Sequence, residues 1–407
     1  MSRIDELIET LCPDGVEYKA LSDIFDLRNG YTPSKKNQAY WRDGTIDWFR
    51  MEDIRLNGRV LDSAIQKVSE SAIKGGRLFD ADSLIVATSA TIGEHALIRV
   101  PFMCNQRFTC LTRKPEYLPK LNIKFAFYYA EKLDQFCLSN TNSGGFSSVS
   151  MPAFKSFPFP VPPMEVQEEI VRVLDSFAEL EAELEAELEA RRRQYAYYRD
   201  KLLSFEINTH THLHQQIRWV RLGDVTSYVN ERIDSRNLAI GTYVGVNELL
   251  QDYLGRSGAV HLPSEDRCIR YEPGDILLGN IRPYLRKMWL ADEVGGTNGD
   301  VLVIRADDKE ILMPEYLRHV ISGEAFTVYN VQHSKGAKMP RGDKAAIMDF
   351  EFPLPPIEQQ RYAVGILDQF DALVNDISQG LPAEIEARRK QYAYYRDKLL
   401  TFKEKIA

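Results

Sequence analysis

The stretch "EARRRQYAYYRDKLLSF" (Glu189–Phe205) returns almost unchanged as "EARRKQYAYYRDKLLTF" (Glu386–Phe402), 197 residues further along a chain of 407 residues. Only two of the 17 positions differ. Ala, Arg, Leu and Lys are frequent in both copies and favour helices, so each copy predicts a helix. A repeat of this length within one chain indicates an internal duplication, which determines the architecture that we expect.

The duplication extends upstream of the two helices. "FPFPVPPMEVQ" (Phe157–Gln167) aligns with "FEFPLPPIEQQ" (Phe350–Gln360) at an offset of 193 residues. The offset grows to 197 further on, so the second copy carries four extra residues near "SQGLPAE" (Ser378–Glu384). Gly380 and Pro382 in that stretch predict a break in the second helix, with Pro382 suited to restarting it.

Two long helices follow from this pattern. Met164–Phe205 contains no Gly and no Pro, which predicts one continuous helix, whereas the second helix should run over 357–378 and 382–405. One stripe of the first helix is apolar or aromatic and is typical of a coiled-coil seam. The stripe consists of Leu184, Leu188, Tyr195, Tyr198, Leu202 and Phe205.

The segments before the helices are short, apolar and punctuated by Gly, Pro and Asn, which indicates strands with irregular loops. "FDADSLIVA" (Phe79–Ala87) faintly matches "YEPGDILLG" (Tyr271–Gly279). We therefore predict an α+β fold in which two strand-rich domains are separated by two long antiparallel coiled-coil helices, with pseudo-twofold internal duplication. The expected bounds are 1–160 and 208–353 for the domains, and 161–207 and 354–407 for the helical segments.

Composition indicates a reduced cytoplasmic protein. The N-terminus has no apolar signal segment, no apolar run is long enough for a membrane span, and the five cysteines show no CxxC spacing. The net charge of −8 argues against a protein that binds only by neutralising phosphates. The acid is concentrated locally, however, since residues 159–208 hold 6 basic against 12 acidic side chains and residues 19–158 hold 19 against 14.

Catalytic signatures are missing from the sequence. It contains no P-loop, no GxSxG and no Asp/Asn-Pro-Pro-Tyr/Phe loop. His210, His212 and His214 alternate in a polar linker that offers a metal no rigid support, so we expect no metal site there. We predict a non-catalytic chain.

A partner surface is expected on the outer face of both helical copies. Tyr197 and Tyr394 fall opposite the seam, beside Lys201 and Lys398, and large aromatic side chains on an outer face suit a protein interface. Packing of the two helices on each other alone remains the alternative.

The chain resembles the specificity subunits of Type I restriction–modification systems over nearly its whole length. The resemblance rests on "YKALSDIFDLRNGYTPS" (Tyr18–Ser34), "SATIG" (Ser89–Gly93) and "FPVPPMEVQEEIVRVLD" (Phe159–Asp175), and on the twice-occurring Arg…Tyr-Arg…Leu-Leu…Phe helix. It implies two target-recognition domains that read a split sequence in double-stranded DNA. It also implies docking of two methyltransferase (modification) subunits and of restriction subunits, with S-adenosylmethionine, ATP and magnesium belonging to those partners.

DNA contacts are expected from polar loops of both domains, because base edges are read by a few polar or cationic side chains. In the first domain these are Tyr31, Thr32, Ser34, Lys35, Lys36, Thr88, Ser89, Thr91, Arg107, Asn142 and Ser143. In the second they are Asn280, Arg282, Tyr284, Arg286, Lys287, Lys335, Lys338 and Arg341. Each has the ordinary solvated loop as its alternative. For the whole chain the alternatives are a coiled-coil scaffold or adaptor without a DNA role, and an enzyme with unrecognised chemistry.

The repeat "ELEAELEAELEA" (Glu179–Ala190) predicts a ruler between the half-sites. Deleting Glu183–Ala186 removes about 6 Å of helix, equivalent to one or two base pairs at about 3.4 Å each, and nearly preserves the seam. Mapping of methylated sites should show a shorter spacer between unchanged half-sites. Deleting two residues turns the seam leucines away and should abolish function. An unchanged spacer in an active four-residue deletion would exclude the ruler.

Overall fold

The structure is a computed structural model that describes residues 3–73, 75, 77–142, 147–204, 217–259, 266–375 and 380–405. The chain divides into two compact units. Unit 1 comprises Met1–Leu180 and Arg388–Ala407, and unit 2 comprises Glu181–Ala387. Each unit therefore includes parts of the long helices, whereas the bounds expected from sequence set the helices apart from the domains.

Unit 1 is built on a five-stranded sheet of order β2-β9-β6-β7-β4, with a three-stranded sheet β5-β3-β8 and the two-stranded pairs β1-β12 and β10-β11. The strands are β1 Tyr18–Ala20, β2 Phe25–Asn29, β3 Ile46–Phe49, β4 Val60–Leu61, β5 Lys67–Val68, β6 Ser83–Ala87, β7 His95–Ile98, β8 Phe102–Cys104, β9 Phe108–Arg113, β10 Thr141–Asn142, β11 Ser148–Val149 and β12 Pro158–Pro160. Strand β6, "SLIVA", is buried at every position, as expected for a central strand covered on both faces.

The helices of unit 1 are α1 Arg3–Leu11, α2 Leu21–Ile24, α3 Met51–Asn57, α4 Ile123–Ser139, α5 Met151–Lys155 and the first part of α6 Met164–Ser204. Helix α4 covers β6 and β7 and buries Phe125 and Leu133 in the main core. The side chain of Asn122 caps α4 by accepting from the backbone N–H groups of Lys124 and Phe125.

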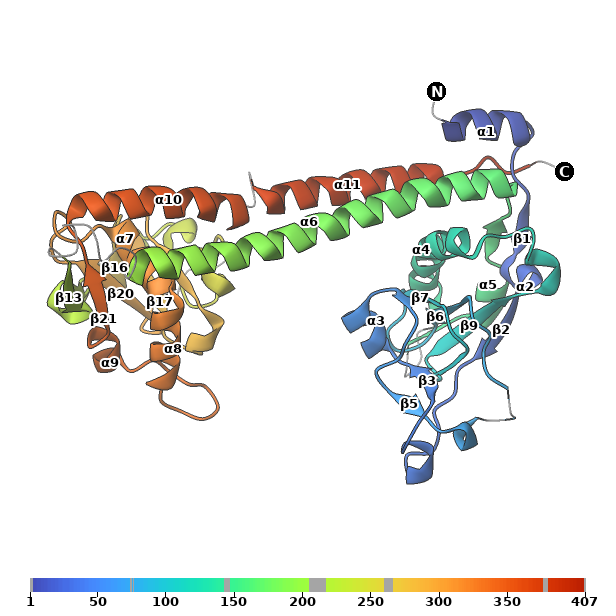
Figure 1. Cartoon of the computed structure of the whole chain (residues 1–407), viewed down its shortest axis with the longest axis horizontal. Coiled ribbons are helices and arrows are strands. Elements are labelled where there is room, and N and C mark those ends of the chain that lie inside the picture. The colour runs from blue at the N-terminus through green and yellow to red at the C-terminus, as the bar shows by residue number, and fades with distance from the viewer. Residues whose placement is uncertain are drawn as a thin grey trace. The chain divides into compact units, whose positions relative to one another are not determined.

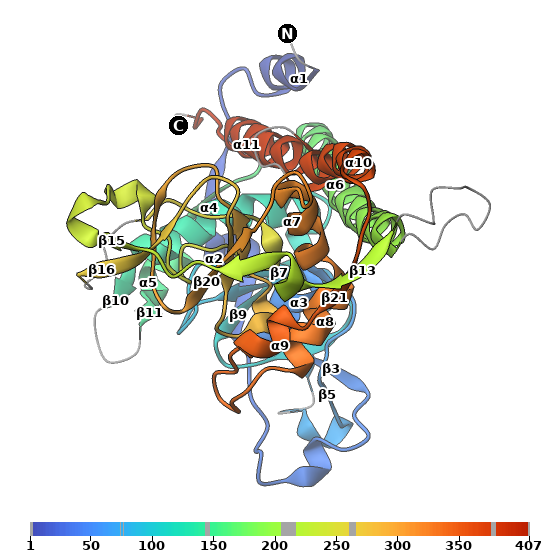
Figure 2. The same ribbon diagram turned by 90° about the vertical axis from the view of Figure 1, so that its left-hand side faces the viewer.

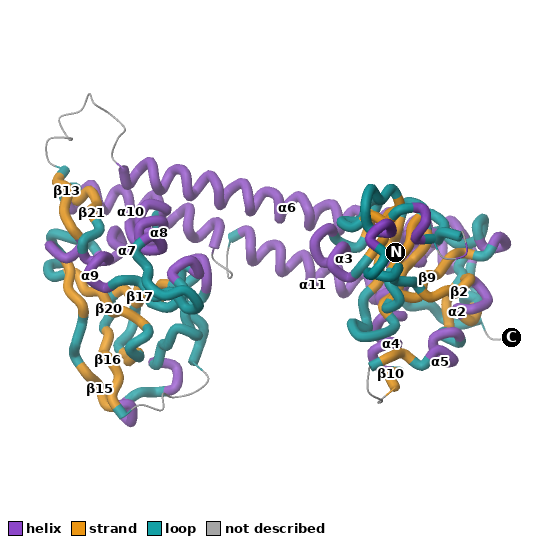
Figure 3. Tube along the Cα trace, turned by 90° about the horizontal axis from the view of Figure 1, so that it is seen from below, coloured by secondary structure: helices purple, strands orange, loops and turns teal. Residues whose placement is uncertain are grey.

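Unit 2 has a four-stranded sheet of order β14-β20-β17-β18, a three-stranded sheet β15-β16-β19 and the pair β13-β21. Its strands are β13 Arg218–Arg221, β14 Thr226–Tyr228, β15 Arg232–Asp234, β16 Arg267–Tyr271, β17 Ile276–Gly279, β18 Met288–Leu290, β19 Gly295–Thr297, β20 Val301–Ala306 and β21 Glu351–Leu354. Its helices are α7 Pro314–Ser322, α8 Glu324–Gln332, α9 Lys344–Met348 and α10 Ile357–Asn375, and α11 Leu381–Leu399 begins in it. Helix α7 lies between the strands and α10 (Figure 3).

The same order and pairing of strands occur in both units. The order β2-β9-β6-β7 in unit 1 corresponds to β14-β20-β17-β18 in unit 2. Tyr18 pairs with Pro160 in one unit, and Trp219 pairs with Pro353 in the other. The sequence match between "FDADSLIVA" and "YEPGDILLG" therefore aligns equivalent strands, β6 and β17, and the predicted duplication is confirmed at the level of the fold.

The long helices agree with the sequence-based expectation at their interruption. Helix α6 is continuous from Met164 to Ser204, whereas in the second helical segment Gly380 lies in a bend and α11 begins at Leu381. The last helix ends at Leu399, before the expected residue 405. The seam residue Phe205 and the linker histidines at 210, 212 and 214 lie outside the described residues.

A fully buried glutamine ties each helix to the strand-rich part of its unit. Gln167 Oε1 accepts from the backbone N–H of Asn122 at 2.8 Å, and its Nε2 donates to the carbonyls of Lys120 (2.8 Å) and Pro162 (2.6 Å). Gln360 repeats all three bonds in unit 2, with Met313 N–H at 2.9 Å and the carbonyls of Ile311 and Pro355 at 2.8 Å each. Both side chains are 0% exposed, so each satisfies backbone groups that water does not reach.

An aromatic pair joins the helices within each unit. Phe177 of α6 stacks on Tyr395 of α11 in unit 1, with ring centroids 5.7 Å apart, and the helices lie side by side there (Figure 1). In unit 2, Phe370 of α10 stacks on Tyr198 of α6 at 6.2 Å. Phe177 and Phe370 are equivalent at the offset of 193, and Tyr198 and Tyr395 at the offset of 197. Offset-stacked rings of this kind add stability beyond their buried area.

An aspartate two residues before the phenylalanine of each pair has different partners in the two units. In unit 1, Asp175 accepts from Tyr128 Oη (2.7 Å) and Lys124 Nζ (2.6 Å). Burial and this hydrogen bond raise the pKa of Tyr128 above its usual value. In unit 2 the equivalent Asp368 lies 2.6 Å from Arg318 Nη2 and 2.8 Å from His319 Nε2.

Within the part of the chain that the structure describes, no helix has the length and apolar character needed to span a bilayer.

Gln360→Ala should lower the free energy of unfolding of unit 2 by about 1–3 kcal/mol or more, because it leaves one buried N–H and two buried carbonyls without partners. Chemical denaturation of the full chain measures the change. Gln359→Ala is the matched control, since Gln359 is a partly buried neighbour whose side chain has no hydrogen bond to the described residues, and it should change stability by about 0.5 kcal/mol or less. Equal effects of the two variants would contradict the role given to Gln360.

Candidate nucleic-acid interface

The first two predicted loops of unit 1 meet at the turn Asn105–Arg107. The backbone N–H of Tyr31 donates to the carbonyl of Cys104 at 2.7 Å, and the hydroxyl of Thr32 bonds the Gln106 carboxamide. On the other side of the turn, Thr88 N–H donates to the Arg107 carbonyl at 3.0 Å. Segments that are distant in sequence therefore form one polar surface.

The third predicted loop joins the same surface. The N–H of Ala90 donates to the Ser147 carbonyl at 3.1 Å, and Ser89 bridges to Ser148. Asn142 lies in the short strand that pairs with Ser148. Ser143 and the glycines of "NSGG" lie outside the described residues.

The predicted DNA-contacting side chains of unit 1 differ in their solvent exposure. Ser34, Lys35, Lys36, Arg107 and Asn142 are exposed, and Tyr31, Thr32, Ser89 and Thr91 are partly buried. Thr88 is different, because it is only 8% exposed and its hydroxyl is shared with the buried Thr109 at 2.9 Å. The structure therefore places Thr88 as support for the loop and does not present it at the surface.

The predicted contacts of unit 2 come from two segments that lie together. The carbonyl of Pro340 accepts from Arg282 N–H at 2.7 Å, Ile281 bridges to Arg341, and Lys335 and Arg341 exchange two backbone hydrogen bonds of 2.8 Å. Arg282 and Arg286 have left-handed backbones, both with φ 53°, at the two ends of the short turn Pro283–Leu285. This conformation is uncommon for residues other than glycine and turns the chain sharply between the two arginines.

Several cations of unit 2 already have partners. Lys335 pairs with Asp343 and, by donating to it, holds the pKa of that carboxyl below its usual value. Arg341 lies 3.0 Å from Asp300, and Arg286 lies 3.3 Å from Glu324.

The remaining polar residues of this surface differ in how accessible they are. The Lys287 ammonium donates to the Val246 carbonyl at 2.7 Å. Arg282 and Lys338 are exposed, and no carboxylate among the described residues pairs with them. Tyr284 is 52% exposed between the two arginines.

Asn280 is buried, which sequence reasoning missed. It is 6% exposed, and its Oδ1 has no hydrogen-bond partner. The same is true of Oδ1 of Asn330, which is 5% exposed. A Cβ added to Gly342 would lie 2.8 and 2.7 Å from these two oxygens. Asn280 therefore shapes the loop around Gly342 from beneath and is not presented as a surface contact.

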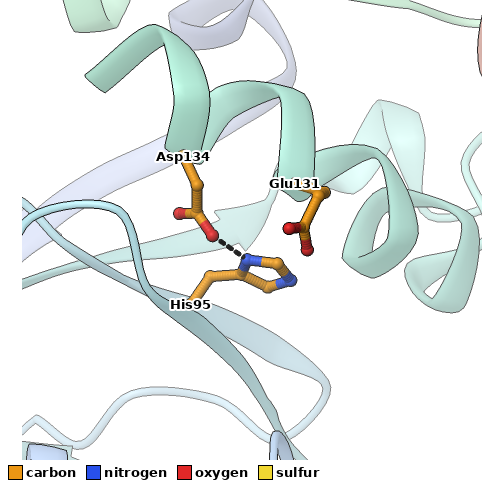
Figure 4. Close-up of side chains that lie close together, drawn as sticks. All are labelled: His95, Glu131 and Asp134. Atoms are coloured by element: carbon orange, nitrogen blue, oxygen red, sulfur yellow. Dashed lines mark hydrogen bonds and ion pairs between the residues drawn. The ribbon is translucent and has the colours of Figure 1, made fainter. Parts of the chain in front are cut away.

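One cluster of unit 1 resembles a metal-ligand set. Atoms of His95, Glu131 and Asp134 lie within 4.8 Å of one another, and the His95 Nδ1 to Asp134 Oδ2 distance is 2.6 Å (Figure 4). Glu131 is already paired with Arg59 at 2.8 Å and approached by Arg396 at 3.7 Å. Because two guanidinium groups flank the carboxylate, the cluster is an ion-paired link between β7, α4 and α11 and disfavours a cation.

The tyrosines of the predicted partner surface are exposed in both helical copies. Tyr197 is 60% exposed and Tyr394 is 64% exposed, and each forms a T-shaped contact of 5.4 Å with the tyrosine that follows it. The Lys201 ammonium lies 5.6 Å from the Tyr197 ring centroid, and Lys398 is exposed in the other copy. Both tyrosines therefore lie on the surface of their own unit, as the helical spacing predicts.

Sequence reasoning also missed residues that line these surfaces. Gln106 contacts Thr32 and is not among the predicted residues. Trp41 and Arg50, near the first loop, gave no periodic or motif signal that separates them from ordinary core and loop residues. Tryptophan and arginine residues lie close together in the sequence around strand β3, and both residue types are enriched at binding surfaces. This enrichment is the sequence signal that could have identified Trp41 and Arg50.

A family model described as "Type I restriction modification DNA specificity domain" matches residues 13–190 and again residues 219–387. The chain is 38% identical over 398 residues to the Type I restriction enzyme EcoprrI specificity subunit of Escherichia coli, which covers 93% of each chain. It is 28% identical over 307 residues to the EcoR124I/EcoR124II specificity subunit of Escherichia coli, covering 70% of this chain and 72% of the relative.

A solved structure has the same fold. It comes from a study of complex assembly and conformational transition of the type I R-M system, and its chain superposes with a TM-score of 0.65. The match covers 95% of this chain and 97% of that chain at 15% identity. The fold class expected from sequence thus agrees with a solved structure of similar fold.

Gly342→Ala should destabilise unit 2 by about 1–3 kcal/mol, because the new methyl group would overlap two buried carboxamide oxygens. Thermal unfolding and proteolysis near residues 333–343 provide the measurement. Gly299→Ala serves as the control, since a Cβ there meets nothing within 4 Å. An unchanged melting temperature for Gly342→Ala would show that the two asparagines can move apart.

Proposed function

This chain belongs to the family of Type I restriction–modification DNA specificity subunits, and we propose that each of its units reads one half of a split target in double-stranded DNA. The family match occurs once in each half of the chain, which supports one recognition domain per half. The loops of both units offer hydroxyl, amide and cationic groups without an activated nucleophile, which suits binding and not bond cleavage.

The observation that carries this proposal is that the two units share their strand order and buried glutamine but differ in their polar loops. Both units keep the same sheet order and the same three hydrogen bonds of a buried glutamine. Their polar loop segments differ, with 31–36 and 105–107 in unit 1 against 282–287 and 335–341 in unit 2. A common frame with different reading surfaces is expected when two half-sites have different sequences.

Two methyltransferase subunits would dock on the repeated helix surfaces around Tyr197 and Tyr394. Similar exposed surfaces suit two copies of one partner, and large aromatic side chains beside lysines supply both apolar area and orientation. Restriction subunits would join this core. S-adenosylmethionine, ATP and magnesium would be bound by those partners, and this chain would supply recognition without chemistry.

The direct test is the set of methylated sites in cells that carry this chain with its methyltransferase. A two-part motif with a fixed spacer is expected. Exchanging unit 2 loops with those of a relative should change one half-site and leave the other intact. A scaffold without a DNA role predicts a methylation pattern that is independent of this chain.

Tyr197→Glu combined with Tyr394→Glu should reduce the number of methyltransferase subunits bound per chain from two to one or none, because two charges enter apolar contact surfaces. Native mass spectrometry of the reconstituted complex measures the stoichiometry. Tyr197→Phe with Tyr394→Phe keeps both rings and should assemble normally. A full complex formed by the glutamate variant would remove these tyrosines from the interface.

A further inference from the structure

Unit 1 contains a cavity that none of the expected DNA contacts explains in full. It has a volume of about 510 Å³ and lies between the first polar loop and strands β3 and β5. These strands lie at the end of unit 1 farthest from its helix α11 (Figures 1 and 2). The size falls within the range of about 300–1,000 Å³ typical of ligand sites.

The lining of this cavity is cationic and aromatic. Lys35, Arg42 and Arg50 supply positive charge, and Trp41 and Trp48 supply indole rings, whose centroids lie 5.0 Å apart at 82°. None of the described residues that line it carries a carboxylate. Such a site favours a ligand that is anionic or rich in hydrogen-bond acceptors and that has a planar ring able to pack against an indole.

The polar groups of the two tryptophans are already engaged. Trp41 Nε1 donates to the Ser34 carbonyl at 3.2 Å, and Trp48 Nε1 donates to the Tyr31 carbonyl at 3.0 Å. The indoles therefore offer only their rings, and they also fix the backbone of the predicted DNA-contacting loop. Trp48 is 5% exposed and forms the cavity floor.

Arg50 is only partly accessible. Its Nε is buried and has no hydrogen-bond partner, which is rare for a buried N–H. Its side chain is 30% exposed, so a ligand in the cavity meets the other guanidinium nitrogens. The guanidinium lies 5.6 Å from the Trp48 ring centroid, a cation–π distance that restrains its plane. Nη2 pairs with Glu52 at 2.9 Å, but the Glu52 side chain is 55% exposed, so water can replace this pair.

We propose that Arg50 is a base-reading residue of unit 1, which donates hydrogen bonds to the acceptor edge of one guanine of the first half-site at this cavity. The inference rests on the proposed DNA-recognition function. Guanine presents N7 and O6 together in the major groove, and a planar guanidinium donates to both at once. Lys35 and Arg42 at the rim meet the adjoining phosphate groups, and the carboxamide of Gln66 lies beside the base edge.

The test compares methylated motifs and duplex binding for the wild-type complex and for Arg50→Ala, each assembled from the full chain and its methyltransferase. The wild-type motif is mapped first, and duplexes with single substitutions in each half-site are then titrated. Arg50→Ala should relax one G·C position of the half-site read by unit 1, with about 5- to 150-fold weaker binding to the wild-type duplex. The other half-site should keep its sequence.

Two further variants separate base reading from charge and folding. Arg50→Lys keeps the charge but lacks the planar pair of donors, and it should also lose discrimination at that position. Arg55→Ala is the matched control, since Arg55 is an exposed arginine of the adjacent helix α3 that does not line the cavity. It should leave the motif unchanged. The backbone N–H of Arg50 still donates to Asp53 in every variant at this position, which preserves the start of α3.

Three results would overturn the inference. The first is an unchanged motif for Arg50→Ala, and the second is relaxation at an A·T position. The third is equal weakening on all sequences with a reduced salt dependence, which would make Arg50 a phosphate contact only. A wild-type complex that methylates no two-part motif would instead refute the proposed function, so the two failures are distinguishable.

Discussion

The buried glutamine at the start of each long helix is the constraint on which the structure depends. Its carboxamide has one acceptor and two donor hydrogens, and all are used on backbone groups that would otherwise be buried without partners. The bonds of Gln167 connect the first turn of α6 with the loop that leads into α4. Because the same bonds recur around Gln360, each helix leaves its recognition domain in a fixed local geometry, whatever the loops contain.

This arrangement lets the loops vary while the frame stays constant. In unit 1 the polar surface is assembled from turns near residues 31, 89 and 106, whereas in unit 2 it is assembled from two segments near 282 and 340. Neither set of loops contributes to the glutamine bonds or to the stacked pairs of Phe177 and Phe370. Changes of target sequence therefore need not disturb the helices.

The sequence was most informative where it repeats. The helix of α6, the break before Leu381 and the equivalence of β6 and β17 all followed from comparing the chain with itself. Individual contacts were harder to predict, because a polar residue in a loop has no periodicity. Thr88 and Asn280 show the difficulty, since both belong to polar motifs and both turn inward to support their loops. The unpartnered donor of Arg50 is visible only when its three-dimensional surroundings are known.

Unit 1 includes residues that follow unit 2 in the sequence, from Arg388 onward. Leu400 is 1% exposed within its main core, Phe402 packs on Phe125, and Val16 bridges to Glu404. During translation the ribosome must add all of unit 2 before these residues emerge, which takes about 10–40 s at roughly 5–20 residues per second. The nascent recognition domain that is made first thus waits with an uncovered apolar surface, and the domain made second is enclosed earlier. Termination of translation within unit 2 would accordingly damage the half of the protein that was synthesised first.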